Sequence, residues 1–361
     1  MNSPSFHLLL SGHDTIECAY YLALFEGACL LDYEALAVQK EELRQSKSRK
    51  PKPVQLGCEE FMLASHGTGS GYPFLIENDA FSIQFGEFNK PNFFVTYRSV
   101  ALWHQGAQGL HERFLRWAES VRLRPYRPES LSRVDFTFDY YLPVIDFDQD
   151  GFVSQADKDA QHRKHGKIQT FRFGTGDVVL RIYNKCDEIN ETSHKTWLYE
   201  LWSIDHDVWR IEWQVRKQVL RSVGIRTFED LKERQGDLLR LLVTQHTSLR
   251  IKTEDSNRSR WPLHPLWLDL TAQVNKMEGL GVVRELDIAG LLDERMMRIA
   301  ISIYGYLKRV AAIDCLQTGE EKAYVDETFE RLKRLVDDVH DPLTWQQDVK
   351  RRMTEMRLGE W

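Results

Sequence analysis

The sequence contains no run of about 18 uncharged apolar residues, the length that a membrane-spanning helix requires. Its first residues, MNSPSFHLLLSGHD, have no basic segment followed by a long apolar stretch. We therefore expect no signal peptide, no membrane partner and a cytoplasmic location. No internal repeat of fixed length is present, which excludes solenoids and propellers.

Cysteine and excess positive charge are also lacking. The five cysteines are widely scattered and include no C-x-x-C pair, which argues against a zinc ribbon and a disulfide framework. We expect reduced, structural thiols. The chain has 48 Lys and Arg against 54 Asp and Glu, a net charge of −6. Because a protein that binds nucleic acid over its whole surface would be strongly basic, any DNA contact should be a local patch.

Composition and local patterns predict a globular α+β protein. The 361 residues are 42% apolar and 28% charged, enough for two compact domains or one large domain with an appendage. We predict a β-rich segment over residues 1–105, a mixed segment over 106–250, and a linker with a helical region over 251–361. Helices are predicted over 32–44, around 154–165, from about 110, and after Thr227, where Thr227-Phe-Glu-Asp230 has the capping-box pattern. The predicted fold is a mostly antiparallel central sheet with helices on one face, followed by the helical C-terminal region.

Three predicted strands each carry ionisable side chains on one face and apolar side chains on the other. Alternate residues of a strand share a face. The ionisable faces hold Arg133, Asp135 and Asp139 in SRVDFTFDYY, Arg181, Tyr183 and Lys185 in DVVLRIYNK, and Arg210, Glu212 and Arg216 in VWRIEWQVRK. For any one strand, a solvated sheet face with paired charges is the alternative interpretation.

If the three strands are neighbours, their charged faces form one candidate reaction centre. Asp135, Asp139 and Glu212 would then hold a hard divalent cation through oxygen ligands. Tyr183 would lie beside the metal, where a bound phosphate and nearby cations favour the phenolate. Attack of that phenolate on a phosphodiester would give a covalent phosphotyrosine and conserve the bond energy for rejoining.

The same residues carry a family resemblance. The run TFRFGTGDVVLRIYNK, with SRVDFTFDYY before it and RIEWQVRK after it, resembles the replication initiation factor family of rolling-circle plasmids, to which relaxases of some conjugative elements are related. The likeness covers about residues 110–250. The matching positions are Arg133, Asp135, Asp139, the turn 171–174, Arg181, Tyr183, Asn184, Lys185, Arg210 and Glu212.

The resemblance implies that residues 106–250 form a metal-dependent nicking-joining domain. Tyr183 would be the nucleophile, with Arg181, Lys185 and Arg210 neutralising phosphate and Mg²⁺ or Mn²⁺ as cofactor. The sequence departs from the family in two places. Thr175-Gly176-Asp177 stands where the family has Arg or Ser after the turn, and no His-hydrophobe-His pair is present, so the metal set would consist of carboxylates.

DNA is the expected partner, as a single-stranded or hairpin origin. The predicted DNA contacts are Arg122, Arg124, Arg127, Arg133, Arg172 and Arg216, of which the first three are interleaved with Tyr126. A host helicase and a single-strand-binding protein are expected by resemblance, and a homodimer is also considered. Tyr20, Tyr21 and Tyr199 are the other candidate nucleophiles, with core packing as their alternative role.

Two further functions stay open at this point. In the first, the chain is a relaxase of a conjugative element and uses the same Tyr183 chemistry. Alternatively, it is a non-enzymatic origin-DNA-binding protein with an inert sheet. The loop Asp146–Asp157 adds a calcium-dependent variant of the second possibility, because it matches much of an EF-hand loop, with Gly151 at position 6. A strand ending in Pro143 precedes it and Asp157 replaces the usual Glu, so a capping loop is the main interpretation.

Overall fold

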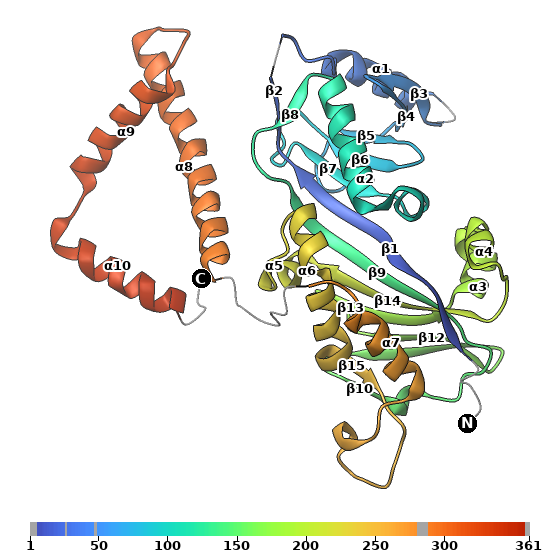
Figure 1. The fold of residues 1–361 in the computed structure, drawn as a ribbon. Helices are drawn as coiled ribbons and strands as arrows, with labels where there is room; N and C mark the ends of the chain where they lie inside the picture. The colour runs from blue at the N-terminus through green and yellow to red at the C-terminus, as the bar shows by residue number, and fades with distance from the viewer. Residues whose placement is uncertain (1–5, 26, 47–48, 280–287, 358–361) are drawn as a thin grey trace. The chain divides into compact units, whose positions relative to one another are not determined.

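A single large antiparallel sheet organises most of the chain (Figure 1). The computed structural model describes residues 6–25, 27–46, 49–279 and 288–357. The eleven strands are, in spatial order, β11 (Asp159–Lys164), β12 (Lys167–Phe173), β13 (Val178–Asn184), β14 (Val208–Arg216), β9 (Ser130–Tyr141), β1 (His7–Tyr20), β7 (Phe93–Tyr97), β6 (Phe81–Phe85), β5 (Phe74–Glu77), β4 (Glu59–Leu63) and β3 (Lys52–Leu56). All neighbouring pairs in this sheet are antiparallel, which confirms the predicted fold class.

Before residue 288, the described residues also form two short ribbons and seven α-helices. The ribbons pair β2 (Leu22–Leu24) with β8 (Leu123–Pro125), and β10 (Phe152–Ser154) with β15 (Thr247–Leu249). The helices are α1 (Tyr33–Gln45), α2 (Ser99–Ser120), α3 (Lys185–Glu188), α4 (Trp197–Trp202), α5 (Lys217–Ser222), α6 (Phe228–Leu241) and α7 (Pro265–Asn275). Among the described residues no helix is both long enough and apolar enough to cross a membrane.

The local sequence signals account for several of these elements. Asp32 caps α1 by accepting a hydrogen bond from the backbone N–H of Ala35, and Thr227 and Asp230 form the predicted capping box of α6. The helix predicted from about residue 110 begins earlier, at Ser99, and is kinked at Gly106, where the backbone has φ 72°. That interruption explains why the helical periodicity becomes regular only after it.

The helix predicted over residues 154–165 is wrong. This segment forms the end of β10 and all of β11, which pairs with β12 through a tight turn. His165 and Gly166 both have positive φ, 49° and 78°, as the two central residues of a hairpin turn require. The turn therefore decides the structure of a polar segment that has little apolar periodicity of its own.

The chain divides into two compact units, Met1–Asp287 and Ile288–Trp361. This division differs from the boundaries that we placed after residues 105 and 250. β1 pairs with β9 across the first boundary, and Trp267, beyond the second, packs against Trp213 with ring centroids 5.8 Å apart. The second unit consists of α8 (Ile288–Thr318), α9 (Val325–Val339) and α10 (Pro342–Arg357). It confirms the predicted helical C-terminal region.

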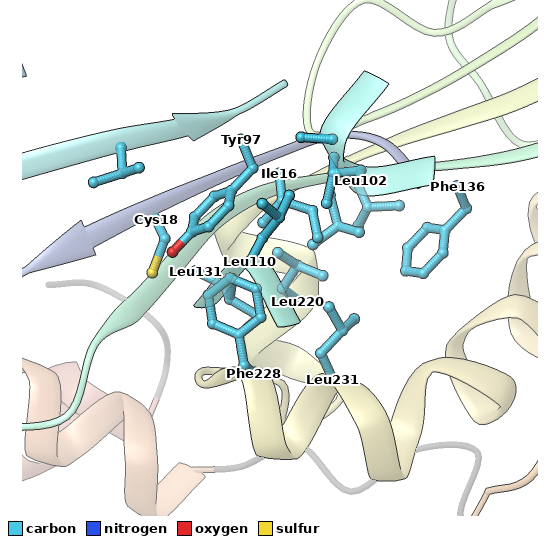
Figure 2. Packing of buried hydrophobic residues seen from close by; sticks show 14 of the residues in the cluster. Ile16, Cys18, Tyr97, Leu102, Leu110, Leu131, Phe136, Leu220, Phe228 and Leu231 are labelled. Carbon is cyan, nitrogen blue, oxygen red and sulfur yellow. The ribbon is translucent and has the colours of Figure 1, made fainter. Parts of the chain in front are cut away.

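The hydrophobic core lies on one face of the central strands. Phe136 of β9 packs there with Leu220 of α5 and Leu231 of α6 (Figure 2). Burying one such side chain contributes about 1.5–3 kcal/mol to folding. Because side chains alternate between the faces of a strand, burial of Phe136 places Asp135 and Thr137 on the opposite, polar face.

His13 is an ionisable side chain held against this core. Its ring centroid is 5.3 Å from that of Phe136, and in the described structure its Nε2 has no hydrogen-bond partner. Burial lowers the pKa of His13 to about 4, although a contact with Gln235 acts in the opposite direction. Folding therefore favours the neutral imidazole.

Replacing His13 with glutamine is expected to make the protein less sensitive to acid. The imidazole takes up a proton below about pH 6.5 in the unfolded chain, but only below about pH 4 in the folded one. The unfolded state thus binds more protons between these values, so stability falls as the pH falls. Between pH 7.5 and pH 4.5, the free energy of unfolding measured with urea should fall by about 2–3 kcal/mol less in the variant than in the wild type. Equal losses in the two proteins would refute this role of His13.

Candidate active site on the polar face of the sheet

The three strands with ionisable faces are neighbours, as the site hypothesis requires. β13 pairs with β14, and β14 pairs with β9. Their register places Tyr183 opposite Arg210, which in turn lies opposite Asp139. In the next row on the same face, Arg181 lies opposite Glu212. The polar faces of the three strands therefore form one continuous surface.

The Tyr183 hydroxyl donates a hydrogen bond to Oε2 of Glu212 over 2.9 Å. The other oxygen of Glu212 lies 3.1 Å from Nη1 of Arg181. Burial and the charge of Glu212 raise the pKa of Tyr183 well above its ordinary value, while Arg210 opposes this shift. The phenol is therefore protonated at neutral pH, and a carboxylate is in place to accept its proton.

Arg210 is fully buried beside Tyr183 and bridges two carboxylates. Its Nε and Nη2 donate to the two oxygens of Asp139 over 2.6 and 2.8 Å, and its Nη1 donates to Asp14 over 2.6 Å. Burial acts to raise the pKa of Asp14, but Arg210 and Lys195 outweigh it and lower that pKa well below its usual range. Because its donors are engaged inside the protein, Arg210 is placed to orient neighbours rather than to contact phosphate as we predicted.

Lys185 is buried beside the Tyr183 ring. It begins α3 directly after β13, and its Nζ lies 5.5 Å from the centroid of the Tyr183 ring. Nζ also donates to Glu188 over 2.5 Å. Burial, aided by Arg210, lowers the pKa of Lys185. At 5.5 Å from the ring centroid, Nζ is close enough to act on charge that develops at Tyr183.

Asp135 is bound by an arginine of its own strand. Arg133 donates to its two oxygens over 2.8 and 2.5 Å and also reaches Glu17 at 3.3 Å. Burial raises the pKa of Asp135 to about 6, with Arg133 limiting the shift. Asp135 and Arg133 thus form a structural ion pair on the rim of the site.

The three acids predicted to bind a metal are not arranged as one ligand set. Their oxygens are already bonded: Asp135 to Arg133, Asp139 to Arg210 and Trp202, and Glu212 to Arg181 and Tyr183. Over the described ranges, no group of three or more His, Cys, Asp or Glu residues could hold a metal ion. Guanidinium groups already neutralise these carboxylates, so the arrangement does not fit the predicted Mg²⁺ or Mn²⁺. We assign no chemical step to a metal.

The loop Asp146–Asp157 also lacks the architecture of a calcium site. Asp148 accepts a hydrogen bond from the N–H of Asp150 at the start of a 3₁₀ turn, and the chain then continues as strand β10 instead of a helix. Asp146 pairs with His264 at 3.2 Å. Asp146 and Asp148 therefore make local contacts within the protein.

The six arginines predicted to contact DNA lie in three places. Arg133 belongs to the ion pair with Asp135. Arg172 and Arg216 are exposed at the edges of the polar face, where Arg172 lies opposite Arg181. The remaining three, Arg122, Arg124 and Arg127, lie on or beside strand β8. Their role as DNA contacts stays a prediction.

Sequence reasoning missed three residues of the site: Asp14, Lys195 and Trp202. Lys195 donates to Asp14 over 3.1 Å, and Nε1 of Trp202 donates to Asp139 over 3.0 Å. Asp14 lies in a register shift of β1, between His13 and Thr15, so strict alternation does not place it on the polar face. Lys195 and Trp202 come from the irregular α3–α4 segment, for which no local pattern signals such a contact.

Comparisons with known proteins include a distant structural likeness. No family model matches the chain, and no curated protein matches it. The structure of the rolling circle replication initiator protein from Geobacillus stearothermophilus is similar with a TM-score of 0.44 and 17% sequence identity, over 74% of this chain and 97% of that one. This likeness is too distant to assign a function.

Proposed function

We propose that this protein cuts and rejoins a DNA strand through a covalent bond to Tyr183, as an initiator of rolling-circle replication. The observation that carries the proposal is the hydrogen bond from Tyr183 to Glu212 on a sheet face that also holds Arg181 and Lys185. This arrangement brings a nucleophile, a base and positive charge together in one place. The sequence resemblance of the flanking strands to rolling-circle initiators supports a phosphodiester as the substrate.

The cleavage step is a transesterification. Oη of Tyr183 attacks the phosphorus atom while its proton passes to Oε2 of Glu212. The bond from phosphorus to the 3′-oxygen breaks, and that oxygen takes a proton from solvent. The DNA 5′-phosphate is then esterified to Tyr183. In the reverse step a 3′-hydroxyl attacks the phosphotyrosine and loses its proton to solvent, the bond from phosphorus to Oη breaks, and Glu212 returns the proton to the phenol.

Positive charge is arranged around the nucleophile in two layers. Arg181 has a side chain 34% exposed and Arg172 is exposed, so both can contact phosphate oxygens directly. Lys185 and Arg210 are buried and act through the field that they create and through the groups that they hold. The buried charges are fixed in place before a substrate binds, which reduces the reorganisation that the transition state requires.

Replacing Glu212 with glutamine tests the proposed base. The amide oxygen can still accept the hydrogen bond from Tyr183, but it cannot take up the proton. We expect the single-turnover rate of strand cleavage to fall about 10²- to 10⁴-fold, with DNA affinity nearly unchanged. Glu17→Gln makes the same chemical change at an acid bonded to Arg133 and should retain the wild-type rate. A wild-type rate in Glu212→Gln would remove Glu212 from the mechanism.

A pool of single-stranded and supercoiled origin-like DNA tests the proposed activity itself. Labelled DNA is incubated with the protein in the presence of Mg²⁺, and the denatured products are examined for a protein–DNA adduct. We expect an adduct that survives denaturation. DNA binding without any adduct, with several metals and on DNA from the same genetic element, would instead favour a non-enzymatic DNA-binding protein.

A further inference from the structure

The ribbon formed by β2 and β8 has an outward face and an inward face, and on the inward face Leu22 and Leu123 are buried whereas Leu24 and Pro125 are exposed. Leu22 and Leu123 point into the core and are only 3% and 6% exposed. Ala23 and Arg124 are paired with each other on the outward face, and alternate residues of each strand share that face. We call this outward face the stacking ribbon; it comprises Tyr21, Phe25, Arg124 and Tyr126, with Arg127 beside it and Arg122 in the turn that precedes β8.

Aromatic rings and guanidinium groups alternate along the stacking ribbon. The guanidinium carbon of Arg124 lies 4.0 Å from the ring centroid of Phe25, and that of Arg127 lies 3.2 Å from the centroid of Tyr21. The rings of Tyr21 and Tyr126 meet edge to face with centroids 6.3 Å apart. Phe25 is 38% exposed and Tyr126 55% exposed, so part of each side chain remains open to solvent.

We propose that the stacking ribbon binds the unpaired bases of single-stranded DNA. Aromatic and guanidinium planes offer stacking surfaces to bases of any sequence, and arginines attract the phosphates between them. A duplex keeps the faces of its bases covered, so this surface would select for unpaired strands. The chain as a whole has a net charge of −6, so its surface is not basic overall.

The carboxylate of Glu119, which lies beside the stacking ribbon, does not prevent this binding. Arg124 donates to Glu119, but the two side chains are 57% and 52% exposed. Such an exposed ion pair contributes only about 0–1 kcal/mol and is readily exchanged for a contact to phosphate.

The stacking ribbon lies apart from Tyr183 along the sheet. β8 ends at Pro125 and β9 begins at Ser130, whereas Asp139 of β9 is in the row of Tyr183. Nine residues of strand separate Ser130 from Asp139 and correspond to about 30 Å. The proposal rests on the proposed function for the identity of the ligand, and it adds a second point at which the DNA strand is held during cleavage.

Fluorescence anisotropy with a labelled 30-nucleotide thymidine oligomer tests the stacking ribbon. Tyr126→Ala and Phe25→Ala are each expected to weaken binding about tenfold, while Tyr126→Phe stays within about twofold of the wild type. An abasic oligomer of the same length should bind the wild-type protein about tenfold more weakly or worse, because it lacks the stacking bases. Arg44→Ala removes a cation from another exposed ion pair, with Glu41, and should leave the affinity unchanged.

Two results would contradict DNA binding by the stacking ribbon. The first is wild-type affinity in both alanine variants, when thermal melting shows that they are folded. The second is equal binding of the abasic and thymidine oligomers to the wild-type protein. Neither result depends on cleavage, because the affinity is also measured in Tyr183→Phe. Adduct formation is followed separately at saturating DNA, where Tyr126→Ala should still form the adduct. If the alanine variants bind DNA like the wild type and the adduct still forms, only DNA binding by the stacking ribbon is refuted. If the alanine variants bind DNA more weakly but the wild type forms no adduct, only the cleavage chemistry is refuted.

Discussion

Replacing Tyr183 with phenylalanine is expected to lower the rate of DNA strand cleavage at least about 10³-fold, because the substitution removes the attacking oxygen and leaves the ring. The ring keeps its place next to Lys185, while the hydrogen bond to Glu212 disappears with the hydroxyl. Affinity for DNA should change little. The rate is measured in single-turnover reactions with an end-labelled single strand.

Tyr199→Phe is the matched control for this prediction. Its hydroxyl donates to the side chain of Asn190 over 3.1 Å, away from the hydrogen bond between Tyr183 and Glu212. This variant should cleave DNA at the wild-type rate. If Tyr183→Phe cleaved as fast as the wild type, Tyr183 would not be the nucleophile and the polar face would be only a charged surface.

Replacing Arg210 with methionine is expected to lower the free energy of unfolding by about 3–5 kcal/mol. The guanidinium group makes bonds to both Asp139 and Asp14, and neither Arg210 nor Asp139 has any exposed side chain. Methionine fills much of the same space but leaves the Asp139 carboxylate buried without its main cation. Urea denaturation at pH 7 measures the loss.

Two further variants separate this effect from a general intolerance of the sheet to substitution. Arg181→Met removes a cation from the same face, but that side chain is 34% exposed and its partner Glu212 keeps the hydrogen bond from Tyr183, so the loss should be smaller than in Arg210→Met. Adding Asp139→Asn to Arg210→Met should restore part of the stability, because it removes one stranded charge. A loss below about 1 kcal/mol in Arg210→Met would show that the buried ion pairs do not hold the site together.

The alternation of side chains in the strands made the candidate site visible in the sequence. Because alternate residues share a face, the apolar positions Phe136 and Trp213 fix which side of the sheet carries Asp135 and Glu212. The adjacency of the strands was only an assumption at that point, since strand order depends on contacts far apart in the sequence. The structure supplies that order, and with it the contact between Tyr183 and Glu212.

Several features could not be predicted because they depend on tertiary contacts. The register shift that brings Asp14 to Arg210 breaks the alternation on which the prediction relied. The predicted metal set treated three acids as free ligands, whereas arginines on the same face compete for their oxygens. The hairpin turn at His165 and Gly166 overrides the weak helical tendency of the preceding residues.

Peptide mapping of the trapped protein–DNA adduct tests the central claim most directly. After cleavage of labelled single-stranded DNA, the adduct is digested with protease and nuclease, and the modified peptide is sequenced by mass spectrometry. We predict a nucleotide 5′-phosphate esterified to Tyr183, with no adduct in Tyr183→Phe. A nucleotide found on Tyr20, Tyr21 or Tyr199 instead, or an unchanged adduct in Tyr183→Phe, would contradict the assignment of the polar sheet face as the active site.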